Sequence, residues 1–129
     1  MDLRVSTRRM NGWTVIQAEG ELDLLTAPRL RRRLTGALRD GPAPVLADLR
    51  GVTFCDASGL RALVAAHHAA RRFSMRLPFV VAPNSRLLRV LRLTELDGML
   101  ELHSDVPAAM AGADPIGAAT ARAFNSTAN

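Results

Sequence analysis

Residues 45–60, VLADLRGVTFCDASGL, are the centre of the predicted fold. The apolar run that opens this stretch, residues 44–49, has the length of a strand and is typical of one covered on both faces of a sheet. Residues 51–56 are expected to connect this strand to a helix that begins at Ser58 and ends near Arg72, because apolar residues recur there at helical spacing. The stretch therefore predicts a strand, a loop and a helix, and the loop is where function is to be sought.

A hairpin and a first helix are predicted before this stretch. Residues 3–10 and 13–18 have strand patterns on either side of Asn11-Gly12, which is a strong signal for a two-residue hairpin turn. A helix is expected to follow Thr26, whose side chain suits an N-cap, and to end at the Asp40-Gly41-Pro42 turn.

Arginine dominates the outer side of this first helix. Arg29, Arg32 and Arg39 point away from its apolar stripe when residues are placed about 100° apart. We interpret these arginines as a solvated face, and a nucleic-acid-binding patch is the alternative.

Two further strands and two further helices are predicted after residue 72. A strand at residues 77–82 precedes a short amphipathic helix, for which Ser85 supplies a cap. A last strand at residues 99–103 precedes a short helix that Ser104-Asp105 can cap and that runs through Met110.

A hairpin followed by alternating helices and strands predicts a single α/β domain. We expect a mixed four- to five-stranded sheet, opened by the β-hairpin, with about four helices packed on it and right-handed crossovers between parallel strands. The domain is expected to span residues 1–111, and residues 112–129, rich in Ala, Gly, Thr and Asn, to form a flexible C-terminal tail.

The composition restricts the chemistry. The chain has 129 residues, 17 arginines, no lysine, 12 acidic residues and a formal charge of +5. Its lone Cys55 forms no internal disulfide and no thiolate zinc site, and three histidines add few other ligands, so neither a metal nor a cofactor is expected.

No apolar run approaches the ~20 residues of a membrane span, and the N-terminus is charged where a signal peptide needs an apolar stretch. We expect a soluble, cytoplasmic protein.

Ser58 lies where the predicted loop meets the predicted helix, two residues after Asp56, and three interpretations compete. Either residue could cap the helix, an interaction worth ~1 kcal/mol. Ser58 could instead be a catalytic nucleophile. It could also accept a phosphate, because a helix N-terminus offers free N–H groups and a positive dipole end.

The nucleophile interpretation is the weakest of the three. The hydrolase elbow needs a Gly-x-Ser-x-Gly frame, and Asp56 and Leu60 occupy both glycine positions. His67 lies nine positions further along the same helix, ~13 Å from Ser58, and nothing in the sequence points to His103 as a base. We expect no enzymatic activity.

Several motifs, in this order and spacing, resemble the STAS family of anti-sigma-factor antagonists. They are GELD at residues 20–23, Thr26-Ala27, residues 45–60 and LRVLRLTELD at residues 88–97. The resemblance extends to about Gly112.

The resemblance implies a protein of partner-switching regulation of transcription, as in stress responses. Such antagonists bind an anti-sigma factor with an ATP-binding kinase fold, which frees the sigma factor, until the kinase phosphorylates a serine; a serine phosphatase reverses this. Ser58 matches that serine, and the phosphate's added charge would disrupt docking. The implied partner-binding residues are Asp23, Asp56, Ala57, Ser58, Gly59 and Leu60, with Gly59 giving the partner room and Asp48 in a structural role.

Other expectations accompany this interpretation. Ala57 stands where the family commonly has Ser or Thr, which leaves one acceptor, and Cys55 is expected to be a buried apolar residue rather than a redox sensor. The free protein is expected to be a monomer or weak dimer that contacts neither nucleic acid nor membrane directly. The alternatives are a STAS module of another regulatory or sensory complex and, with less support, a small nucleic-acid-binding domain, which the +5 charge suggests.

Overall fold

The computed structural model describes residues 2–117 and shows five strands in one sheet, in the order β1-β2-β3-β4-β5. β1 pairs antiparallel with β2, and the other pairs are parallel. The predicted mixed sheet, hairpin and four helices are confirmed. The strands are β1 (Leu3–Met10), β2 (Trp13–Leu22), β3 (Val45–Cys55), β4 (Phe79–Val80) and β5 (Leu102–His103); the helices are α1 (Ala27–Asp40), α2 (Ala57–Arg72), α3 (Arg86–Leu93) and α4 (Val106–Ala111), with a 3-10 turn η1 (Leu96–Gly98).

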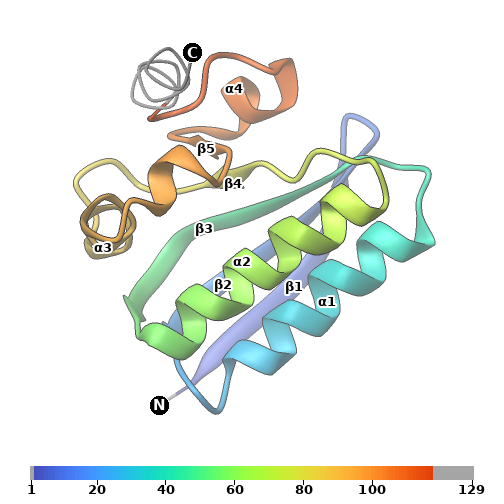
Figure 1. The fold of residues 1–129 in the computed structure, drawn as a ribbon. Helices are drawn as coiled ribbons and strands as arrows, with labels where there is room; N and C mark the ends of the chain where they lie inside the picture. Colours follow the sequence, from blue (N-terminus) through green and yellow to red (C-terminus); the bar gives the residue numbers. More distant parts are fainter. Residues whose placement is uncertain (1, 118–129) are drawn as a thin grey trace.

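The helices cover the two faces of the sheet unequally. Because the strands follow one another in chain order, right-handed crossovers place their connecting helices on one face. α1 and α2 lie side by side there (Figure 1), and with α3 they enclose the larger core. α4 packs on the other face, where Val106 and Ala109 meet Leu46, while the next residue, Ala47, belongs to the larger core. β3 is therefore covered on both faces, as predicted.

Two strands run further than predicted. Residues 51–56, expected to be a loop, belong mostly to β3, which continues to Cys55 beside a longer β2. The register between these strands shifts twice, between Gln17 and Glu19 and between Gly20 and Glu21. These irregularities hide the alternating pattern that marks a strand, since an extra residue exchanges the two faces.

The described part of the predicted tail contacts the domain. The Ile116 N–H donates to the Leu102 carbonyl at 2.7 Å, and the two residues form an antiparallel bridge. Residues 118–129 lie outside the described residues. Within residues 2–117, the helices are too short or too polar to cross a bilayer.

Candidate functional site

Two loops leave the same edge of the sheet, where the parallel strands β2 and β3 end. Asp23 follows β2 and Asp56 follows β3, and the Asp56 N–H donates to the Leu22 carbonyl at 3.1 Å, which joins the two strand ends. In open α/β sheets, ligands bind beyond the carboxyl ends of the strands. This edge therefore brings together the two acidic positions that the sequence singled out.

Asp56, not Ser58, caps α2. The Asp56 Oδ1 accepts a hydrogen bond from the Gly59 N–H at 3.0 Å, and α2 begins at the exposed Ala57, one residue earlier than predicted. The Ser58 Oγ, half-buried, accepts a hydrogen bond from the Arg61 Nη2 at 3.3 Å. The cap is thus made without the Ser58 hydroxyl, which lies at the positive end of a 16-residue helix.

Asp23 organises the other loop. Its Oδ1 accepts hydrogen bonds from the N–H groups of Leu25 and Thr26, both at 3.0 Å. The backbone hydrogen bond from Thr26 is the main cause that lowers the pKa of the Asp23 carboxyl, although burial opposes it. Thr26 was predicted to cap α1, but its side chain makes no such bond; it is buried, and its hydroxyl donates to the Glu21 carbonyl at 2.7 Å. These bonds hold the loop in one shape.

Large apolar side chains are exposed beside the two loops, and the sequence analysis missed them. Leu24 is 69% exposed and Leu25 84%, both next to Asp23, and Phe54 at the end of β3 is 42% exposed. Leu24 and Leu25 come before α1 and do not continue the apolar stripe of that helix. Two adjacent leucines outside a buried pattern are the sequence signal that could have identified an exposed apolar pair. We call Asp23, Leu24, Leu25, Phe54, Asp56, Ala57 and Ser58 the docking edge.

Gly59 faces the interior of the domain rather than the docking edge. A Cβ on Gly59 would lie 2.6 Å from the Cys55 Sγ and 2.8 Å from the Leu22 carbonyl oxygen, so glycine is required for the start of α2 to approach β2 and β3. Packing inside the domain therefore requires glycine here, and the expectation that Gly59 also gives a partner room stays a prediction. Leu60 is half-buried and packs against the larger core. Burial, together with Asp56, raises the pKa of the Cys55 thiol to about 12, which agrees with an inert packed thiol.

Comparison with known proteins identifies this architecture. The family model described as the STAS domain matches residues 4–109. The chain belongs to the STAS family. The anti-sigma-F factor antagonist RsfB of Mycobacterium tuberculosis is 31% identical over 111 residues, covering 85% of this chain and 88% of that protein. The anti-sigma-B factor antagonist of Staphylococcus aureus is 25% identical over 103 residues, covering 80% and 94%.

Solved structures share the STAS fold. An anti-sigma factor antagonist from Mycobacterium paratuberculosis superposes with a TM-score of 0.76 at 24% identity, covering 86% of this chain and 93% of that one. The unphosphorylated form of the anti-sigma factor antagonist SpoIIAA gives a TM-score of 0.60 at 15% identity, covering 82% and 91%.

No histidine in the described part of this STAS domain hydrogen-bonds to Ser58. His67 is half-buried on α2, and burial, with smaller contributions from His68 and Arg71, lowers its pKa. His103 is buried on β5, where its Nε2 lies 2.7 Å from the Glu101 Oε2. Among residues 2–117, no group of acidic, histidine or cysteine side chains could hold a metal ion.

Asp48 has a structural setting on β3. Its side chain is buried, and the Arg50 guanidinium donates to it twice, Nε to Oδ1 at 2.9 Å and Nη2 to Oδ2 at 2.8 Å. Burial alone would raise the pKa of the Asp48 carboxyl, but these hydrogen bonds outweigh burial and hold that pKa below its usual value.

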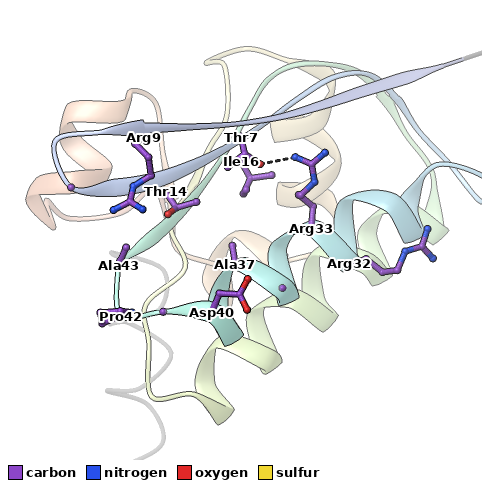
Figure 2. A pocket seen from close by; sticks show the side chains of 13 residues that line it. Thr7, Arg9, Thr14, Ile16, Arg32, Arg33, Ala37, Asp40, Pro42 and Ala43 are labelled. Atoms are coloured by element: carbon purple, nitrogen blue, oxygen red, sulfur yellow. Dashed lines mark hydrogen bonds between the residues drawn. The ribbon is translucent and has the colours of Figure 1, made fainter.

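A cleft of about 650 Å³ lies at the opposite end of the parallel strands, between the hairpin and the C-terminal half of α1. Figure 2 shows Arg33 reaching from α1 to Thr7, whose Oγ1 accepts its hydrogen bond at 2.6 Å. Arg9 and Asp40 also line this cleft, but neither Ser58 nor the docking edge contributes to it. This cleft is therefore separate from the candidate site.

Proposed function

We propose that this STAS domain is an anti-sigma factor antagonist that binds an anti-sigma factor of the ATP-binding kinase fold through its docking edge and so frees a sigma factor. Phosphorylation of Ser58 by that anti-sigma factor would abolish the binding, and a serine phosphatase would restore it. The names of the relatives support the coarser part of this proposal, antagonism of an anti-sigma factor. A cytoplasmic setting follows, since transcription takes place there.

The observation that carries the proposal is the placement of Ser58. Its hydroxyl lies at a helix start that Asp56 already caps, and the loop that carries the exposed Leu24 and Leu25 leaves the same edge of the sheet. A kinase can phosphorylate this hydroxyl without disrupting the Asp56 hydrogen bond that caps α2. The transfer joins the Ser58 Oγ to the γ-phosphorus of ATP, with ADP as the leaving group and the hydroxyl proton released.

The same geometry indicates how phosphate would act. A phosphoserine carries about −1.5 to −2 charges. The helix dipole and Arg61, whose Nη2 is 3.3 Å from the Ser58 Oγ, would stabilise that charge, so the fold would survive. A partner that buries Leu24 and Leu25 would have to desolvate the phosphate, and its interface would also face Asp23 and Asp56. The switch would therefore act at the interface and not by unfolding.

Incubation with the cognate anti-sigma kinase and ATP tests the proposal. We expect one phosphate, which mass spectrometry assigns to Ser58, and loss of the complex in size-exclusion chromatography. Ser58→Ala should bind whether or not ATP is present, and Ser58→Asp should bind at least about tenfold more weakly, because repulsion and desolvation at the interface persist. Phosphate on another residue, or a phosphorylated protein that still binds, would refute the mechanism.

A further inference from the structure

Four arginines converge on a groove between α1 and α2, on the outer surface of the helical layer. Arg31, Arg32 and Arg39 from α1 and Arg72 from α2 line it, and all four are exposed. None of them belongs to an ion pair in the described part of the chain, where the paired cations are Arg4, Arg29, Arg50, Arg76 and His103.

The groove has no acidic residue in its lining. Asp40, the acidic residue of α1, lines the hairpin cleft instead (Figure 2). Arg32 lines both this groove and the hairpin cleft, whereas Arg31, Arg39 and Arg72 line the groove alone of the two. The lining thus carries four positive charges and no negative one, and an anionic ligand would reduce their mutual repulsion, so this groove differs from a solvated face of alternating charges.

From this arrangement we propose that the groove between α1 and α2 binds an acidic polypeptide segment of a partner protein. Arginine presents a planar fork that pairs with carboxylates in two-bond geometry. Between the arginines, the floor carries Ala65 and Ala69, which offer small apolar side chains room to pack. An extended segment with acidic residues interspersed with alanine-sized residues fits this lining.

The shape of the groove favours such a segment over nucleic acid or a membrane. The groove encloses about 400 Å³, which is room for a few residues of one extended chain but not for a nucleic-acid duplex. No aromatic side chain lines it to stack on the bases of a single strand, and no large apolar side chain lines it to enter a bilayer. This site is separate from the docking edge and does not depend on Ser58.

Fluorescence anisotropy with a labelled peptide of alternating Glu and Ala tests the proposal at low ionic strength. We expect Arg31→Gln/Arg39→Gln/Arg72→Gln to weaken binding about tenfold, since each exposed ion pair contributes modestly. The matched control is Arg86→Gln/Arg89→Gln/Arg92→Gln, which removes the same charge from exposed positions of α3 and should weaken binding less than twofold. Equal losses in the two variants, or no binding to the unaltered protein, would overturn the proposal.

Thr35→Glu provides a second variant. Thr35 lines the groove between Arg31 and Arg39, and a glutamate there would pair with both at the i, i+4 spacing, which supports the helix while lowering the positive charge of the groove. It should weaken peptide binding, and far-UV circular dichroism should show an intact fold. Ser58→Ala should leave peptide binding unchanged, which separates this test from that of the proposed function. Tighter binding of an oligonucleotide or of phosphatidylserine vesicles than of the peptide, with the loss confined to the groove variant, would also refute it.

Discussion

Asp56 and Gly59 perform the structural work at the start of α2. The Asp56 carboxylate satisfies a backbone donor, and Gly59 lets the helix lie against β2 and β3. Ser58, between them, has a side chain whose one hydrogen bond among the described residues is with Arg61. The chemistry of recognition and the chemistry of folding are thus divided between adjacent residues.

Gly59→Ala should destabilise the protein by about 1–3 kcal/mol, because the new methyl group overpacks a site closed by the Cys55 Sγ and the Leu22 carbonyl. The matched control is Gly36→Ala on α1, where an added Cβ meets nothing within 4 Å. That substitution should stabilise the protein by about 0.5–1 kcal/mol through helix propensity. Urea unfolding measures both, and equal effects would contradict the packing argument.

At the scale of elements, the parallel pairing of β2 with β3 creates the docking edge. The loops that follow these strands must emerge together, and the hydrogen bonds of Asp23 and Thr26 hold the first loop so that Leu24 and Leu25 remain outside the core. Exposed leucines at a fixed position are the kind of anchor that a partner protein buries.

Leu24→Ala/Leu25→Ala should weaken binding to the anti-sigma factor at least about tenfold, because fully burying a leucine side chain contributes about 1.5–3 kcal/mol. Its effect on the free energy of unfolding should stay within about 0.5 kcal/mol, since both side chains are exposed. Leu93→Ala is the control, a leucine 78% exposed on α3, outside the docking edge. Isothermal titration calorimetry should show unchanged binding for it, and a comparable loss would remove the leucines from the interface.

At the scale of the molecule, the two faces of the sheet are covered by different kinds of residues. α1, α2 and α3 bury one face in an apolar core, whereas the other face combines the small α4 cluster with the Asp48–Arg50 pair. A buried carboxylate is tolerated there because a half-exposed guanidinium neutralises it.

Arg50→Met should destabilise the protein by about 2 kcal/mol near neutral pH, a value reduced from that of a fully buried pair because Arg50 is partly exposed. The pKa of Asp48 is below its ordinary value in the folded protein, so the pair stabilises above the unfolded pKa and is lost as pH falls through the folded one. In the variant, burial without Arg50 raises the pKa of the Asp48 carboxyl. As the pH falls, protonation then removes the free-energy cost of burying an unpaired carboxylate. The difference between the two proteins in urea should therefore shrink from pH 7 to pH 4; a constant difference would contradict this account.

Sequence patterns predicted most of the fold, and the errors fall where tertiary pairing overrides local signals. The hairpin at Asn11-Gly12 was predicted correctly because both turn residues adopt positive φ, which asparagine tolerates and which glycine, lacking a Cβ, adopts freely. Residues 51–56 were predicted to be a loop, although β3 continues to Cys55, because the bulged register of β2 and β3 disguises their alternation. The cap signal at Thr26 was misread, since a threonine hydroxyl can also bond to a distant carbonyl once the chain brings that carbonyl near.

The sequence by itself determined the family, the order of elements and the position of Ser58, because these depend on local periodicity and on motifs of fixed spacing. Only the tertiary structure decided that Asp56 caps α2, that Gly59 is required by close packing, and that Leu24, Leu25 and Phe54 are exposed near the ends of β2 and β3. Likewise, only the packing of α1 on α2 gathers four arginines around one groove. The physical reason is the same in each case. Burial, close approach and charge clustering arise between segments that are distant in the chain, and the periodicity of one segment does not show which segments will pack against it.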